Sequence, residues 1–224
     1  MSHTLSIKLR SGTQQAHTDA ENIGFMKCFV QGVVDRECFS KFLSNLYFVY
    51  SELETAIEKN KQHPVISGMY FPELNRQSSL EKDMAFYHGN LWTNFIKPST
   101  ATEKYITRIY EISAHEPALL LGHAYTRYMG DLSGGQMLQK IAQSALKLSG
   151  YEGTEFYNFE QIPDKQAFKN KYRQALDTII VDDITADKIV AEANHAFYLN
   201  MEIIKELETI LIQALGRATY NDLV

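Results

Sequence analysis

The stretch GDLSGGQ, residues 130–136, puts three glycines into six positions of a segment that otherwise has a helical pattern. A glycine inside a helix costs about 1 kcal/mol relative to alanine, so the chain must have a use for them. Gly130 and Gly134 share one helical face, where bare backbone can bend or approach a neighbour closely. Tight packing between helices explains two such glycines. The presence of a third glycine, Gly135, with the polar Asp131 and Ser133 between, fits better with backbone laid over a flat ligand.

The letters LSGGQ also match the signature loop of ABC-type ATPases, which contacts a nucleotide phosphate. Such proteins need a Walker A loop, GxxxxGK[ST], whose backbone amides and lysine hold the phosphates. The sequence contains no Gly-Lys pair, and it lacks the strand pattern on which that loop is mounted. A phosphate role for these residues is therefore disfavoured.

His17 stands in QQAHTDAEN, with Glu21 one helical turn later. Glu21 is close enough to hold an imidazole N–H directly or through water. A histidine that binds a metal uses one ring nitrogen as ligand while an acceptor orients the other. A single helical histidine is more often an ordinary side chain, so both readings stay open at this point.

Carboxylate di-iron sites in helical bundles use two ExxH motifs and two further glutamates, and Glu192-x-x-His195 supplies one such motif. None of the other histidines has a glutamate three residues before it. We therefore predict that His195 is a surface or packing residue.

Lys165, Lys169 and Arg173 recur at four-residue steps and form a basic stripe on one helical face. Such a stripe is usually a solvated surface. It could instead hold carboxylates, for which arginine offers a planar pair of donors and lysine a point charge. Asn200 falls on an apolar helical face and should have a polar partner or line a wet pocket.

In the segments that carry these residues, apolar residues recur at helical spacing almost throughout. The apolar–polar alternation typical of strands is nearly absent. Capping boxes are predicted at Ser78-x-x-Glu81 and Thr100-x-x-Glu103. No internal repeat or long linker divides the chain, so we predict one all-α domain over residues 1–224. The predicted helices cover residues 4–20, 24–33, 36–60, 79–92, 102–115, 117–148, 164–181 and 184–215.

Composition limits the possible functions further. The chain has 224 residues, 45% of them hydrophobic, and a net charge of -5, which argues against general nucleic-acid binding. No apolar run approaches the roughly 20 residues of a membrane span, and the N-terminal residues lack a targeting signal. Cys28 and Cys38 stand among apolar residues and are expected to be buried free thiols rather than a disulfide. We predict a soluble cytoplasmic protein.

Five stretches taken together resemble heme oxygenase: QQAHTDAEN, LYFVYSELETAIEKNK, YFPELNR, HAYTRYMGDLSGGQMLQKIAQ and FKNKYR. The resemblance runs through nearly the whole chain in the order of the family, and residues 123–143 are its most specific part. It implies an all-α fold in which heme b lies between the first, proximal helix and a kinked, glycine-rich distal helix. Gly130, Gly134 and Gly135 would lie on that distal helix, whose backbone passes over the heme face.

The resemblance also assigns roles around the heme, which would be both substrate and oxygen-activating cofactor, with O2 as co-substrate. His17 matches the proximal iron ligand, and Glu21 matches the residue that orients it. Lys165 has no counterpart in the family. The positions that match residues beside the heme propionates are Arg10, Tyr125, Lys169 and Arg173.

Asp131 matches the distal aspartate of the family, which does not bind iron but orders water that can supply a proton. The close distal backbone would direct oxygen to one edge of the ring. The resemblance thus implies cleavage at the α-meso carbon to biliverdin IXα, with release of carbon monoxide and ferrous iron. The polar groups that match the surrounding water network are Tyr50, Tyr105, Arg127, Tyr128 and Asn200.

The chain departs from the membrane-bound animal members, because it lacks their hydrophobic C-terminal anchor. It looks like a soluble bacterial, cyanobacterial or plastid-type enzyme, for which ferredoxin is the expected electron donor and a bilin reductase a further partner. The main alternative is a non-catalytic heme carrier or sensor on the same fold, which would keep His17 but could dispense with Asp131. A helical relative with an organic substrate or a di-iron site fits less well, because it would lack the glycine pattern.

Overall fold

Helices account for all the regular structure of residues 4–224, the part of the chain that the computed structural model describes. This confirms the predicted all-α fold. The α-helices are α1 (Leu5–Gly12), α2 (Gln14–Glu21), α3 (Gly24–Val30), α4 (Arg36–Lys59), α5 (Pro64–Ser67), α6 (Gln77–His88), α7 (Thr100–His115), α8 (Leu120–Leu146), α9 (Lys165–Thr178), α10 (Asp183–Leu215) and α11 (Arg217–Leu223). Short 3-10 helices are η1 (Pro72–Leu74), η2 (Trp92–Asn94), η3 (Pro117–Leu119) and η4 (Glu155–Tyr157).

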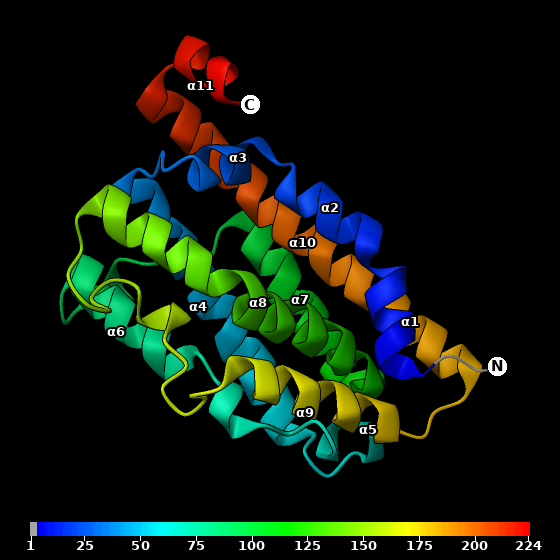
Figure 1. Ribbon diagram of the computed structural model, residues 1–224. Helices are drawn as coiled ribbons and strands as arrows, with labels where there is room; N and C mark the ends of the chain where they lie inside the picture. Colours follow the sequence, from blue (N-terminus) through cyan, green and yellow to red (C-terminus); the bar gives the residue numbers. More distant parts are fainter. Residues whose placement is uncertain (1–3) are drawn as a thin grey trace.

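The long helix α10 organises the domain. It packs against α1, α2 and α3, and also against α4, α7 and α8. In Figure 1 the blue helices α1 and α2 follow one another along the orange α10, while the green α8 runs across the middle of the molecule. Apolar residues at helical spacing, such as Ile189, Ala193, Ile203 and Leu207, are buried along α10. They join one continuous core.

The first predicted helix, residues 4–20, is two helices in the structure. The break falls at Thr13, whose φ of -106° and ψ of 2° lie outside the helical range. The Thr13 hydroxyl donates to the carbonyl of Leu9 at 2.8 Å, and such a bond back to the preceding turn bends helices. The break starts α2, which carries His17 and packs against α10.

The predicted capping box at Ser78 is wrong. Helix α6 begins at Gln77, and its N-cap residue, Arg76, makes no side-chain cap. Instead, the buried carboxylate of Glu54, on α4, accepts the backbone N–H groups of Arg76 and Gln77. The free backbone N–H groups at this helix start bond to a side chain of a distant helix, so the residues around the start carry no signal of it.

The second predicted capping box is wrong by one residue. The Ser99 hydroxyl accepts the backbone N–H of Thr102 at 3.2 Å, and Thr100 is the first residue of α7. Two short helices, α5 and α11, were not predicted. Helix α11 buries Tyr220 against α3, where the backbone of Gly24 makes room for the tyrosine hydroxyl.

Close packing between helices does use a glycine, but at Gly122. A Cβ there would lie 2.8 Å from the backbone nitrogen of Ala193 and 2.9 Å from the carbonyl oxygen of Ile189. Gly122 therefore lets α8 approach α10 closely, and the Thr126 hydroxyl donates to the Ala193 carbonyl at 3.2 Å one turn later. This contact fixes the position of α8 on α10.

Cys28 and Cys38 are buried and unpaired, as predicted. Among the helices of residues 4–224, none combines the length and the apolar character needed to cross a membrane.

Candidate functional site

Four polar side chains from three helices meet at the middle of α8, and we call them the Asp131 network. The Tyr50 hydroxyl, from α4, donates to the Asp131 carboxylate. Arg127, one turn before Asp131 on α8, donates from Nε to the Tyr50 oxygen at 3.1 Å and from Nη1 to Oδ1 of Asn200, on α10, at 2.5 Å. Its Nη2 lies 3.8 Å from Oδ1 of Asp131. The structure thus brings together four residues that the sequence analysis singled out.

Burial sets the charge balance of this network. It raises the pKa of the Asp131 carboxyl above its usual value, against the opposing effects of Arg127, Tyr50 and Arg76. Burial also raises the pKa of Tyr50 well above its usual value, so Tyr50 stays protonated and acts as a donor. A carboxyl with a raised pKa is better matched to proton exchange near neutral pH. The network can therefore hold and move a proton at Asp131.

Tyr105 and Tyr128, two further predicted residues, lie beside this network without joining it. Both side chains are buried, and neither hydroxyl has a hydrogen-bond partner within residues 4–224. The rings of Tyr128 and Tyr50 contact each other, with centroids 5.9 Å apart. Buried hydroxyls are rarely left unpaired in proteins. The hydroxyls of Tyr105 and Tyr128 are therefore available to bind water or a ligand.

The glycines of α8 divide into two kinds. A Cβ placed on Gly130 or Gly134 would meet no atom within 4 Å, so packing does not explain either residue. A Cβ on Gly135 would lie 3.0 Å from the ring of Tyr157. Packing against η4 therefore explains Gly135, and its predicted contact with heme rests on the resemblance alone.

His17 lies on α2, with its side chain 54% exposed. Its Nδ1 is 3.4 Å from a carboxylate oxygen of Glu21, the predicted orienting residue. The ring packs edge-on against Phe197 of α10, with centroids 5.9 Å apart. Phe197 precedes Asn200 by three residues and so shares a helical face with it. One face of α10 therefore contacts both His17 and the Asp131 network.

The predicted basic residues gather where α1, α8 and α9 meet. Tyr125 of α8 is close enough to these charges to be affected by them. Burial raises the pKa of its hydroxyl, whereas Thr13, Arg173 and Arg10 lower it. Arg10 and Lys169 make no ion pair within the described residues, and Arg173 donates only to Asn170, at 3.1 Å. Lys169 lies one turn before Arg173 on the same face of α9. These cations remain free for an anionic group.

Other lysines nearby are already engaged. Lys8 binds Asp183 at 2.9 Å and Asp187 at 3.1 Å. Lys171 lies 3.4 Å from Glu73, and its ammonium also sits over the ring of Phe71.

His195 is exposed and contacts Tyr198, as expected of a surface residue. Glu192 points elsewhere, into a buried contact with Arg108 and His123. The two residues of the ExxH motif therefore do not form a common site.

Sequence reasoning missed three contacts of the site. It did not identify Phe197 as the neighbour of His17, Tyr157 as the neighbour of Gly135, or the buried pair His123 and Glu192. His123 did stand in the most specific stretch of the resemblance, HAYTRYMGDLSGGQ, but nothing local indicates a partner 69 residues away.

Comparison with known proteins identifies the family of the chain. The family model described as heme oxygenase matches residues 3–206. Heme oxygenase 1 of Nostoc sp. is 51% identical over 223 residues, which cover 100% of this chain and 94% of that protein. The crystal structure of Synechocystis heme oxygenase-2 in complex with heme and NO superposes with a TM-score of 0.97 at 46% identity, over 99% of this chain and 92% of that one. Synechocystis heme oxygenase-1 in complex with heme gives a TM-score of 0.93 at 50% identity, over 99% of this chain and 100% of that one. The chain belongs to the heme oxygenase family.

Proposed function

We propose that this chain binds heme as its substrate between His17 of α2 and the glycine backbone of α8, and opens the ring to biliverdin with release of carbon monoxide and iron. The observation that carries the proposal is the bare, open face of Gly130 and Gly134 beside the buried carboxyl of Asp131. A flat ring can approach such backbone, and the Asp131 carboxyl belongs to the same stretch of α8. Membership of the family and the heme-bound Synechocystis relatives support the same reading.

The residues present fit a heme in three respects. His17 is exposed on one side and held by Glu21 on the other, the arrangement of a histidine ligand with its orienting partner. The open glycine face of α8 would cover the opposite face of the ring. The free cations Arg10, Lys169 and Arg173 suit the two propionates, because charge-assisted bonds to carboxylates are the strong ones.

Heme would supply the site for oxygen activation, and the protein would supply position and protons. His17 would bind the iron through its Nε2, with Nδ1 held toward Glu21. Tyr50 and Arg127 hold Asp131 in one orientation. The Asp131 carboxyl, with its raised pKa, would then deliver a proton through ordered water to the reacting oxygen.

The same network argues against a heme carrier or sensor. A carrier needs a ligand and a propionate clamp, but it has no use for a buried carboxyl beside the open face. Burying Asp131 and Arg127 is costly unless both are paired, and the chain pairs them with Tyr50 and Asn200. A buried and fully paired carboxyl of this kind fits a proton-transfer role.

Selectivity for the α-meso carbon is part of the proposal. The backbone of α8 and the clamp of Arg10, Lys169 and Arg173 would together fix the in-plane orientation of the ring. Chromatography of the bilin formed from hemin tests this. We expect biliverdin IXα alone, and a mixture of isomers would contradict a fixed orientation.

The Gly134→Ala variant should separate stability from function. The added methyl group meets no protein atom, so we expect the apo protein to gain up to about 1 kcal/mol in the free energy of unfolding. The same methyl group would displace the heme, and we expect the rate of biliverdin formation to fall roughly 10-fold or more. Urea unfolding of the apo protein and a turnover assay measure both effects.

Gly122→Ala is the matched control. Its methyl group would meet the backbone of α10, so this variant should lose stability instead of gaining it. If Gly134→Ala kept the wild-type rate, the glycine face would not be the heme surface.

Ferredoxin is the proposed electron donor, on grounds of charge. Arg10, Lys169 and Arg173 form a basic group on an otherwise acidic chain, where an acidic donor protein could dock beside the propionates. Exposed charges are screened over about 10 Å at 0.1 M salt, so association should slow with ionic strength. A soluble, cytoplasmic location and a bilin reductase as the next enzyme belong to the same proposal.

The charge reversal Lys165→Glu tests this docking. Lys165 lies on α9 one turn before Lys169 and makes no ion pair within the described chain, whereas Lys171 is held by Glu73 and is a poorer probe. We expect turnover driven by ferredoxin to fall at least about 3-fold at low salt, with heme affinity and ascorbate-driven turnover unchanged. Lys104→Glu, on the exposed side of α7, is the control. Equal rates for both variants, insensitive to salt, would place the donor elsewhere.

A further inference from the structure

Helix α11 lies outside residues 3–206, the part of the chain that the family model matches. It packs against α3 and α10. Figure 1 shows it, in red, at the end of the orange α10 and next to the blue α3. Gly216 makes the turn between α10 and α11 with a φ of 82°, a conformation that glycine adopts readily. The features that the family shares do not explain this helix.

Side chains of both helices attach α11 to α3. The Tyr220 side chain is buried, and its hydroxyl occupies the space that a Cβ on Gly24 would fill. Gln31 donates from Nε2 to the Leu223 carbonyl at 2.8 Å, and Lys27 donates from Nζ to the next carbonyl of the chain at 3.0 Å. The last carbonyls of a helix have no partner within it, so these bonds satisfy them. Helix α11 thus holds α3 from its first residue to its C-cap.

Helix α3 also connects the two sides of the proposed heme site. It follows α2, which carries His17, after two residues only, and it packs against α8. The proposed heme would lie between α2 and the glycines of α8. The position of α3 therefore sets the separation of these two helices at one end of the site.

A cleft of about 340 Å³ lies between the end of α3 and the later turns of α8. Residues 30–32 line one side of it, and the other side is lined by Lys140, Ile141, Ser144 and Ala145. Gln31 lies at this cleft, but its side chain bonds to Lys27 and to Leu223 of α11. The end of α3 is therefore fastened toward α11 and open toward α8.

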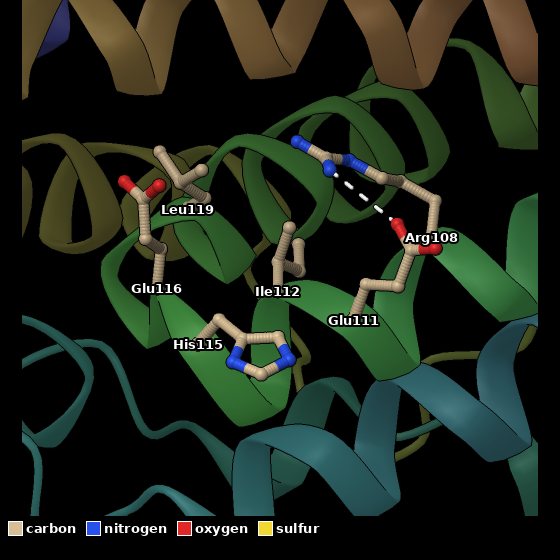
Figure 2. Close-up of a pocket in the computed structure, with 6 residues that line it drawn as sticks. All are labelled: Arg108, Glu111, Ile112, His115, Glu116 and Leu119. Carbon is tan, nitrogen blue, oxygen red and sulfur yellow. Dashed lines mark ion pairs between the residues drawn. The ribbon is translucent and has the colours of Figure 1, made fainter.

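A second cleft, of about 350 Å³, is of a different kind. The residues that line it all belong to the continuous stretch from Arg108 to Leu119. Arg108 lies 3.6 Å from Glu111 at this cleft (Figure 2). A cleft within one stretch of chain does not widen when two distant helices move apart, whereas the cleft between α3 and α8 does.

We propose that Tyr220 is a positioning residue for the proposed heme site. Its hydroxyl fills the space over Gly24 and so holds α3 in place, and α3 keeps α2 and α8 at the separation that a bound heme needs. Without this contact α3 would move more freely, and movement of such elements controls how ligands enter and leave a site. The inference rests on the heme site proposed above.

Transfer of heme to apomyoglobin measures how firmly the chain holds heme and needs no turnover. We expect Tyr220→Ala to release heme roughly 3- to 10-fold faster than the wild type, a size typical of residues that act on a site from a distance. Gly24→Ala should do the same, because its methyl group would displace the Tyr220 hydroxyl. Both changes break one contact, so the double variant should release heme no faster than the faster single variant. Asn221→Ala, an exposed position on α11, is the control and should match the wild type.

Urea unfolding of the apo proteins separates this role from a general loss of stability. A less stable Tyr220→Ala protein that releases heme at the wild-type rate would show that α11 only stabilises the fold, and would overturn the proposal. Multiplied effects in the double variant would also overturn it, because the two residues would then act through different contacts.

Hydrogen exchange of the apo protein tests the first step without heme. We expect the amides of residues 14–31 to exchange faster in Tyr220→Ala than in the wild type, and to be unchanged in Asn221→Ala. Unchanged exchange in Tyr220→Ala would contradict the proposal. A wild-type chain that bound no heme would refute the proposed function instead, and the exchange experiment would still decide whether Tyr220 holds α3.

Discussion

Replacing His17 by alanine should abolish the histidine-ligated heme spectrum. His17 lies against Glu21 and the edge of Phe197, and it is the histidine that we propose as the iron ligand. Removing a partner of a metal ligand usually weakens metal affinity about 10- to 100-fold, and removing the ligand itself should cost more. We expect the resonance Raman band of the iron–histidine bond to disappear, and added imidazole to restore a ligated spectrum.

His195→Ala is the matched control, because this exposed histidine packs against Tyr198 and is not the proposed iron ligand. Its heme spectrum should equal that of the wild type. Glu21→Gln should keep the ligand but alter the iron–histidine band, since the orienting carboxylate is lost. An unchanged band in His17→Ala would mean that another residue binds the iron.

Replacing Asp131 by alanine should separate binding from chemistry. We propose that Asp131 positions water and does not bind the iron, so heme affinity should stay close to the wild-type value. Loss of a positioned proton donor costs about 10²- to 10⁴-fold in rate, and we expect biliverdin formation to slow within this range. Heme titration and single-turnover absorbance spectra measure the two quantities separately.

The Asp131 variant leaves Arg127 and Tyr50 without a carboxylate partner, so circular dichroism must show that the fold is intact. Asp131→Asn keeps the size and the capacity for hydrogen bonds but removes the proton-transferring carboxyl, and it should be nearly as slow. Ser133→Ala, an exposed position in the same stretch, should behave as the wild type. A wild-type rate in Asp131→Ala would remove this residue from the mechanism.

Local patterns predicted the helices well where the apolar period is long, as in α4 and α10. They failed where the cause is distant or depends on a single side chain. Thr13 breaks the first helix through a bond to Leu9, and the start of α6 is satisfied by Glu54 from another helix. Neither contact can be seen in the few residues around a helix end.

The same limit applies to the site. The sequence left tight packing open for Gly130 and Gly134 while favouring a flat ligand, and the open space at both positions argues against packing. It did not distinguish them from Gly135, whose neighbour Tyr157 lies on a separate segment. Motif resemblance named the residues of the Asp131 network, but only the packing of α8 on α10 explains how Asn200 reaches Arg127, 73 residues away in the chain.

Aerobic incubation of the purified protein with hemin and a ferredoxin reducing system tests whether this chain opens heme. We expect one heme bound for each chain, followed by loss of the Soret band and growth of biliverdin absorbance, with carbon monoxide released in equal amount. Ascorbate in place of ferredoxin should give the same bilin more slowly. A Soret band that persists with both reductants, without bilin or carbon monoxide, would rule out heme opening by this chain and would favour a heme carrier or sensor.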